Sequence, residues 1–171
     1  MQIPDYAKQL LAPYYDAALL RQTDVEVRIP QRVASVVRMA HMMGHALAQH
    51  WVPIGASPRL GLIQVHPDYW PPRTIEELGL IGHELKHQEQ TRNDPNFASD
   101  FDWTAAHIPA DAPPMANLWE AEAYAKEADI VAQLRAQGVG AMLARNIPMR
   151  MALSVAPQID FASCRCGATI L

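Results

Sequence analysis

Length, composition and charge predict one globular domain. The chain has 171 residues, of which 50% are hydrophobic and 19% are charged, and its formal net charge is -4 at pH 7. This length suffices for one hydrophobic core and is short for two, so we expect a single domain over residues 1–171. The lysines and arginines are dispersed, which argues against a nucleic-acid partner because nucleic-acid-binding domains carry a basic stripe.

The sequence shows no sign of a targeting or membrane segment. The stretch MQIPDYAKQLLAPYYDAALL has acids and prolines where a signal peptide would have a basic cluster and then an apolar run. No segment approaches about 18 uninterrupted apolar residues, so we expect no membrane span. We therefore expect a cytoplasmic protein, or a virion protein if a phage encodes it. Cys164 and Cys166 are too close for a disulfide with each other, and we interpret them as part of a tail rather than half of a metal site.

The first part of the chain predicts helices and strands in alternation. Residues 5–22 have the pattern of a helix interrupted by a proline, and residues 24–29 alternate polar and β-branched side chains, as a half-buried strand does. Residues 31–50 have apolar side chains at every third or fourth position, which predicts a helix with one buried stripe. Prolines bracket a loop at 53–58, after which residues 60–66, LGLIQVH, predict a strand.

The middle of the chain predicts a long helix with a defined start. Thr74 and Glu77 have the spacing of a capping box, in which each side chain accepts a hydrogen bond from the backbone of the other residue. A helix should therefore begin at residue 75 and run to about residue 91. An irregular stretch rich in Pro, Asp and Asn follows to about residue 116, and loops of that length are usually functional or mobile.

The last third of the chain predicts two further helices and a tail. The first should cover about residues 116–137 and end at Gly138, and a shorter helix should follow at about 139–146. Residues 149–155 could form a strand, and about residues 148–171 are expected to form a C-terminal tail. The motifs described below, and the family resemblance that they carry, cover about residues 58–137.

The helix from residue 75 contains a motif with metal-binding spacing. In IGHELKHQ, His83 and His87 are four residues apart, so they lie on the same helical face and can offer two imidazole nitrogens to one ion. Glu84 is rotated by about 100° from His83 and can reach a water molecule on such an ion as a general base. The apolar side chains of the helix lie on the opposite side and can anchor it to a core: Leu78, Ile81 and Leu85. The alternative is a pair of partly exposed surface histidines.

A catalytic zinc site needs a third protein ligand, and the stretch NLWEAEAYAKE of the next long helix offers three acids. Glu120 and Glu127 fall on its apolar stripe, where a carboxylate is costly to bury unless it is paired or bound to a metal. We therefore expect Glu120 to be the third ligand, and Glu127 could orient a ligating histidine through a hydrogen bond. Glu122 lies on the polar side and is the alternative ligand.

Glu120 also has a possible role that needs no metal. Asn117 could cap the helix, with Glu120 as the reciprocal member of a capping box three residues later. Capping predicts a helix that begins at residue 118. A start near Pro113 or Pro114 would place Glu120 in the second turn and leave its carboxylate free to bind a metal.

These motifs together resemble a small gluzincin-type zinc metallopeptidase: HELKH, WEAEAY about thirty residues later, and the strand LGLIQVH before the motif helix. The resemblance implies an α+β, zincin-like fold, with the active-site helix packed beside a small sheet and further helices. It implies one zinc ion bound by His83, His87 and Glu120, with Glu84 as the catalytic base. It also implies that the strand before the motif helix lines the cleft and pairs with extended substrate.

The chain departs from the family pattern at two positions. Tyr124 stands where family members often have an aspartate that orients a histidine, and Lys86 occupies a middle position of the motif that is usually uncharged. Tyr124 and His107 are nevertheless further catalytic candidates, because each could donate a hydrogen bond to an oxyanion, and His66 is a weaker one. His41 and His45 share the four-residue spacing without a glutamate between them, and we expect surface or partner contacts there.

The function expected from the sequence is zinc-dependent hydrolysis of peptide bonds in a peptide or protein substrate by a metal-activated water. A function of another class is also compatible with the sequence. The chain could be a catalytically weak or inactive zincin-like protein that serves as a structural or docking component of a larger assembly, for example a phage particle.

Overall fold

The computed structural model describes residues 1–30, 55–101 and 116–146, with side chains to residue 143, and the statements below concern these residues. They form an α+β fold, as the sequence predicts. The elements, in chain order, are α1 (Asp5–Leu11), α2 (Ala17–Gln22), β1 (Asp24–Val27), β2 (Gly55–Arg59), β3 (Leu62–Val65), the 3₁₀ helix η2 (Pro67–Tyr69), α4 (Ile75–Asn93), α6 (Leu118–Ala136) and α7 (Val139–Asn146).

The three strands form one sheet in the order β1-β3-β2, in which β3 pairs parallel with β1 and antiparallel with β2. Sequence analysis missed β2 and assigned its residues mainly to a loop. Pro58 explains the error, because a proline cannot donate to a strand ladder and is confined to edge strands, the position that β2 occupies. The pairing of β2 with β3 is also irregular between Ala56 and Arg59.

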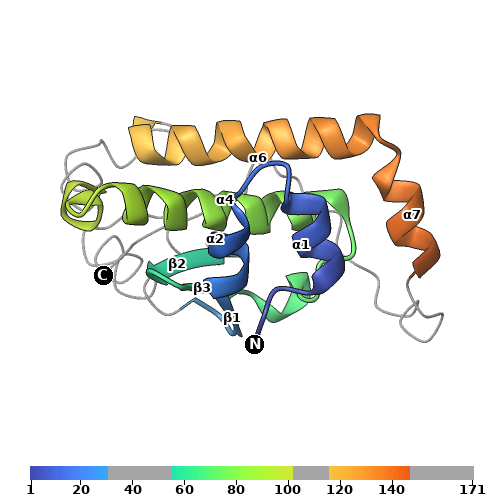
Figure 1. Cartoon of the computed structure of the whole chain (residues 1–171), viewed down its shortest axis with the longest axis horizontal. Helices are drawn as coiled ribbons and strands as arrows, with labels where there is room; N and C mark the ends of the chain where they lie inside the picture. Colours follow the sequence, from blue (N-terminus) through green and yellow to red (C-terminus); the bar gives the residue numbers. More distant parts are fainter. Residues whose placement is uncertain (31–54, 102–115, 147–171) are drawn as a thin grey trace, which may run out of the picture.

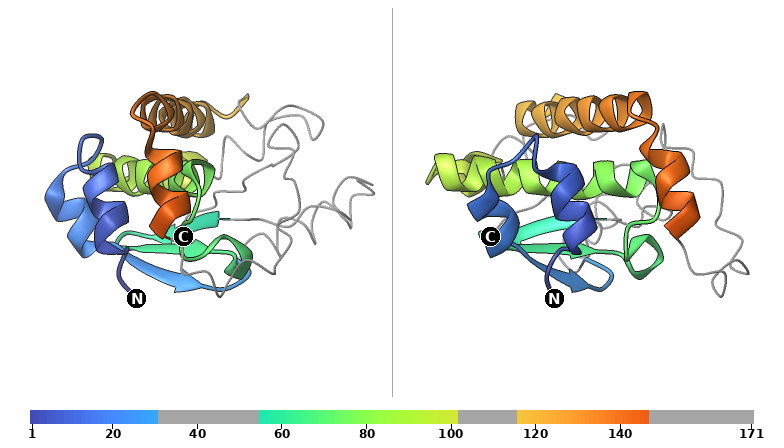
Figure 2. Two further views of the ribbon diagram at one scale, coloured as in Figure 1. Left: turned by 90° about the vertical axis from the view of Figure 1, so that its right-hand side faces the viewer. Right: turned by 45° about the vertical axis from the view of Figure 1, so that its right-hand side comes forward.

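Helix α4 is the centre of the fold (Figure 1). Figure 2 shows it between α6 and the sheet in both views, with α1 and α2 beside it. The predicted capping box is present: the backbone N–H of Glu77 donates to Thr74 Oγ1 at 3.1 Å, and the N–H of Thr74 donates to Glu77 Oε2 at 3.0 Å. The apolar side chains of α4 are fully or almost fully buried in the main core, and Leu80 joins the three that the sequence names: Leu78, Ile81 and Leu85.

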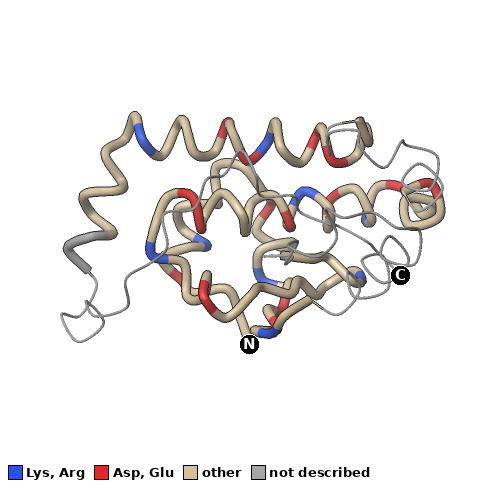
Figure 3. The backbone as a smooth tube through the Cα atoms, turned by 180° about the vertical axis from the view of Figure 1, so that it is seen from behind, with Lys and Arg blue, Asp and Glu red and all other residues tan. Residues whose placement is uncertain are grey.

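Two glycines of α4 let α6 pack closely against it. A β-carbon at Gly79 would lie 2.6 Å from Cγ2 of Val131, and one at Gly82 would collide with the side chain of Ile130. The two helices run antiparallel, since Glu76 near the start of α4 pairs with an arginine near the end of α6. Figure 3 shows residues of both charges along α4 and along α6, so neither helix carries charge of a single sign.

The remaining expectations have mixed outcomes. The interrupted helix expected at 5–22 is present as α1 and α2, and the strand expected at 24–29 is shorter, ending at Val27. The helix expected at about 116–137 is α6, which ends at Ala136, two residues before Gly138 with its φ of 72°. No helix within the described ranges is long and apolar enough to cross a membrane. Several features lie outside the described residues: the helix expected at 31–50 with His41 and His45, the strand expected at 149–155, and Cys164 and Cys166.

Replacing Gly79 with alanine tests the packing of α4 on α6. We expect Gly79→Ala to lower the free energy of unfolding by about 1–3 kcal/mol through overpacking, although alanine favours a helix over glycine by about 1 kcal/mol. In a Val131→Ala background the shortest contact is removed and only the one with Cγ of Glu127, at 3.2 Å, remains, so the same substitution should cost clearly less. Urea unfolding of the four proteins measures both effects, and an equal loss in both backgrounds would contradict the packing.

Candidate metal centre

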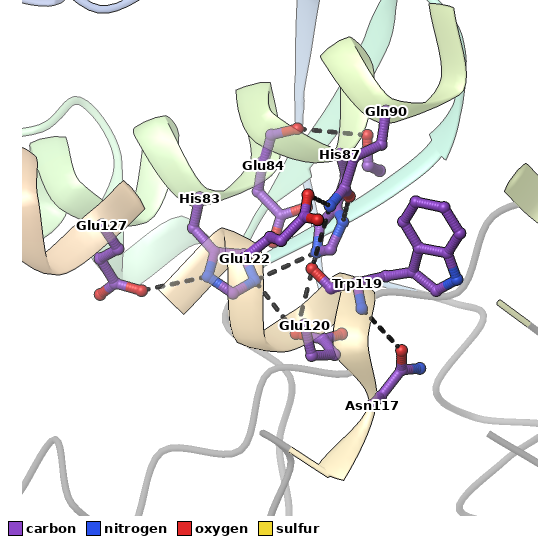
Figure 4. A network of polar contacts seen from close by, with 10 residues as sticks. His83, Glu84, His87, Gln90, Asn117, Trp119, Glu120, Glu122 and Glu127 are labelled. Carbon is purple, nitrogen blue, oxygen red and sulfur yellow. Dashed lines mark hydrogen bonds and ion pairs between the residues drawn. The ribbon is translucent and has the colours of Figure 1, made fainter. Parts of the chain in front are cut away.

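Three side chains from two helices meet between α4 and α6. Nε2 of His83 and Nε2 of His87 are 3.2 Å apart, and Oε2 of Glu120 lies 3.3 Å from the first and 3.8 Å from the second. Both histidines are fully buried, and Glu120 is 4% exposed. One ligand atom from each side chain lies within 4.8 Å of the others, so these residues could hold a metal ion (Figure 4).

The second ring nitrogen of each histidine faces an acceptor. Nδ1 of His83 lies 3.1 Å from a carboxylate oxygen of Glu127, and Nδ1 of His87 lies 2.8 Å from Oε1 of Gln90. The amide nitrogen of Gln90 donates to Glu122 and to a backbone carbonyl of α6, which directs its oxygen toward His87. Both acceptors place the ring hydrogen on Nδ1, so in the neutral rings the two Nε2 atoms present lone pairs to each other.

Two lone pairs at this distance repel each other unless a proton or a cation lies between them. A proton can take this place, since burial lowers the pKa of His83 but hydrogen bonds with Glu120 and Glu127 outweigh burial and raise it to about 10. For Glu120 the signs are reversed: burial raises the pKa of its carboxyl group, but hydrogen bonds with His83 and His87 outweigh burial and lower this pKa to about 2. A divalent cation would satisfy the same lone pairs and the same carboxylate, so the donor set fits a metal.

The position of Glu120 corrects one expectation about α6. The helix begins at Leu118, and the side chain of Asn117 caps it by accepting a hydrogen bond from the backbone N–H of Trp119. From the sequence, a helix that begins at residue 118 predicts a capping role for Glu120, and a start near Pro113 or Pro114 predicts a metal-binding role. The expectation that the later start excludes metal binding is wrong, because a carboxylate in the first turn of α6 still reaches both imidazoles of α4 across the antiparallel helix pair.

Glu84 is buried beside the centre. Its side chain has no exposed surface, and neither of its carboxylate oxygens has a hydrogen-bond partner in the described part of the chain. Figure 4 shows its carboxyl group next to the imidazoles of His83 and His87. Burial raises the pKa of Glu84 to about 8, an effect that the charge of His83 opposes and the charges of Glu120 and Glu127 reinforce. A carboxyl group with a pKa near neutrality can both accept and release a proton.

Aromatic side chains surround the two imidazoles. The ring of Tyr124 packs edge-on against His83, with ring centroids 4.7 Å apart, and the rings of Phe97 and Phe101 lie 6.1 and 5.9 Å from His87. Residues 97–101 are helical, although sequence analysis placed them in an irregular stretch. The four-residue spacing of the two phenylalanines, which puts them on one helical face, is the signal that could have identified this wall.

Other candidates named from the sequence lie away from the cluster. Glu122, the alternative third ligand, has a side chain that is 56% exposed, and its carboxylate contacts Lys86 and Gln90 rather than the imidazoles. The side chain of His66 caps η2. His107 falls outside the described residues. Sequence reasoning did not identify Gln90, although its place three residues after His87 on the same helix was a usable signal.

Metal content tests the ligand set. After zinc loading and dialysis, we expect about one ion per chain in the parent protein and in Glu122→Ala, and less than about a third of an ion in His83→Ala and in Glu120→Ala. Elemental analysis of the folded proteins gives the stoichiometry. Glu122→Ala is the matched control, because it removes an equal charge two residues away. Full loading of Glu120→Ala would show that the carboxylate of Glu120 is not a ligand.

The contact between Glu127 and His83 should strengthen metal binding. We expect Glu127→Ala to lower zinc affinity by about 10–100-fold, because the carboxylate orients the imidazole and makes its Nε2 more basic. Competition against a chromophoric chelator measures the affinity. Asp129→Ala is the control, since that residue bonds to Gln133 on the exposed side of the same helix. Equal affinities for the two variants would refute a role for Glu127.

Comparison with known proteins gives no relative: no family model, no curated protein and no solved structure matches the chain. The assignment of the centre therefore depends on three geometric features. These are the distances between its ligand atoms, the hydrogen bonds that direct both ring hydrogens away from it, and the burial of the whole cluster.

Proposed function

We propose that the protein is a zinc-dependent metallopeptidase of zincin type, with His83, His87 and Glu120 as ligands and Glu84 as the general base. The burial of Glu84 beside the cluster carries this proposal. A buried polar group without a hydrogen bond costs on the order of 1–3 kcal/mol, and more when it is charged. A structural role does not account for this cost, since the carboxylate accepts no hydrogen bond from the described residues. A role in proton transfer accounts for it, because a general base must be free to accept a proton.

The ligand types and their spacing support zinc. Imidazole and carboxylate are common zinc ligands, and bonds of about 2.0–2.2 Å in a tetrahedral arrangement separate neighbouring ligand atoms by roughly 3.3 Å. The corresponding distances here are 3.2, 3.3 and 3.8 Å. A set of three protein ligands is typical of catalytic zinc, which keeps one position for water or substrate. Bound zinc supplies Lewis-acid chemistry, which polarises a peptide carbonyl and makes a water molecule more acidic.

The protein's own side chains would do the remaining work. Glu84 would accept a proton from the attacking water and pass it to the leaving amine. Glu127 and Gln90 would keep both imidazoles in orientation through their Nδ1 hydrogens. Tyr124 and His107 stay predictions for donors of a hydrogen bond to the oxyanion.

An extended substrate would bind beside β2 rather than beside the strand named from the sequence. The expectation that residues 60–66 pair with substrate is wrong, because β3 lies between β1 and β2 and both of its edges are occupied. β2 pairs on one side only within the described ranges, and its first residue, Gly55, lies against Glu84. A peptide added at the edge of β2 that no described strand occupies would therefore pass close to the proposed base.

Glu84→Gln tests the proposed base. The change keeps the shape of the side chain and removes its basicity, so zinc content should stay at about one per chain while kcat/KM on a quenched peptide library falls at least about 100-fold. Glu89→Gln is the control on the same helix, since Glu89 pairs with Lys86 away from the cluster, and it should keep the parent activity. Activity of Glu84→Gln within tenfold of the parent would exclude this base.

A second candidate function is structural, and the origin of the ligands favours it. They come from α4 and α6, each of 19 residues, so a bound ion would cross-link these two helices. The protein would then be a catalytically inactive component of a larger assembly, such as a phage particle. Full zinc loading with no turnover of the peptide library, together with a stable multisubunit species in light scattering, would support this function over the peptidase.

A further inference from the structure

The motif presents two different faces of α4. His83 and His87 face α6 and its Glu120. Glu84 and Gln88 are also four residues apart, but they face the β2–β3 hairpin, whose backbone contacts both side chains. Consecutive residues of a helix are offset by about 100°, which explains why the two pairs point in different directions. The carboxyl group of Glu84 is therefore positioned from the side of the sheet.

Gly55, the first residue of β2, makes room for this carboxyl group. A β-carbon on Gly55 would lie 2.5 Å from Oε1 of Glu84 and 3.1 Å from its Cδ and Cγ atoms. Among the described glycines only Gly61 and Gly138 have a positive φ, so the backbone conformation of Gly55 does not require a glycine. The position of Glu84 does favour a glycine, because a β-carbon at residue 55 would force its carboxyl group to shift.

Gln88 keeps β2 from moving away from α4. Its side chain is fully buried. Its amide group forms hydrogen bonds of 2.5–2.9 Å with four groups of the hairpin: the hydroxyl of Ser57, the carbonyls of Arg59 and Leu62, and the N–H of Gly61. The strand is thus held to α4 one helical turn from Glu84, so a larger side chain at residue 55 would displace the carboxyl group rather than the strand.

We infer that Gly55 is a positioning residue for Glu84: the missing side chain leaves the place that the carboxyl group occupies, and Gln88 maintains that place by holding β2 to α4. The catalytic meaning of this contact rests on the proposed function. The contact itself does not, because it depends only on the packing of two described elements. Gly55 lies against Glu84 and is not one of the three proposed ligands, so a substitution at Gly55 should leave the zinc content unchanged.

Thermal unfolding of the zinc-loaded protein tests the contact without any activity measurement. Gly55→Ala should lower Tm by about 4–8 °C in the parent, where it overpacks against the carboxyl group, and by less than about 2 °C in a Glu84→Ala background. Gly140→Ala is the matched control, since its β-carbon would lie 3.2 Å from Ile75, and its effect should be equal in both backgrounds. An equal shift for Gly55→Ala in both backgrounds overturns the inference. If Gly55→Ala alone does not fold, recovery of folded protein in the double variant supports it.

Kinetics then test whether the contact positions the base. Gly55→Ala should lower kcat at least tenfold, with full zinc content and a KM within about threefold of the parent, because the substitution moves the base rather than the ligands. A kcat within twofold of the parent overturns the positioning role. If the parent cleaves no peptide, the proposed function fails, whereas the thermal comparison still decides whether Gly55 accommodates Glu84.

Discussion

Two imidazole nitrogens that face each other at 3.2 Å between α4 and α6 impose the main constraint on this structure. Both rings are fully buried, and acceptors on their far sides hold the ring hydrogens away from the cluster. Their lone pairs therefore need a positive partner inside the protein, where an unsatisfied polar group is costly. The carboxylate of Glu120 adds a negative charge from the opposite helix, so the cluster as a whole favours a cation.

The close packing of α4 and α6 makes this arrangement possible. Gly79 and Gly82 lack side chains where Val131 and Ile130 of α6 pack, so α6 lies near enough for its acids to reach the imidazoles. Packing and polar contacts depend on each other here. The apolar contacts place Glu120 and Glu127 beside the histidines, and the contacts with those histidines offset the cost of burying Glu120 and of partly burying Glu127.

The sheet packs on the other side of α4, where its β2–β3 hairpin positions Glu84. Its hairpin is hydrogen-bonded to Gln88, and its backbone passes so close to Glu84 at Gly55 that a β-carbon there would displace the carboxyl group. The carboxyl group is thereby kept out of water and beside the cluster, where charges act on one another more strongly than in solvent. The ligands thus depend on α6 for their arrangement, and the proposed base depends on the sheet.

The sequence by itself determined the features that arise within about one helical turn. The start of α4 follows from Thr74 and Glu77, and the common face of His83 and His87 follows from their spacing. The buried side of α6, with Glu120 and Glu127, follows from helical periodicity.

Only the tertiary structure decided that β2 and not β3 lies at an edge of the three-stranded sheet in the described part of the chain, that Phe97 and Phe101 pack on His87, and that Gly55 accommodates Glu84. These features join residues that are distant in the sequence, or lie in segments where proline and glycine suppress the regular pattern. Their positions depend on how whole elements pack, which no local spacing encodes.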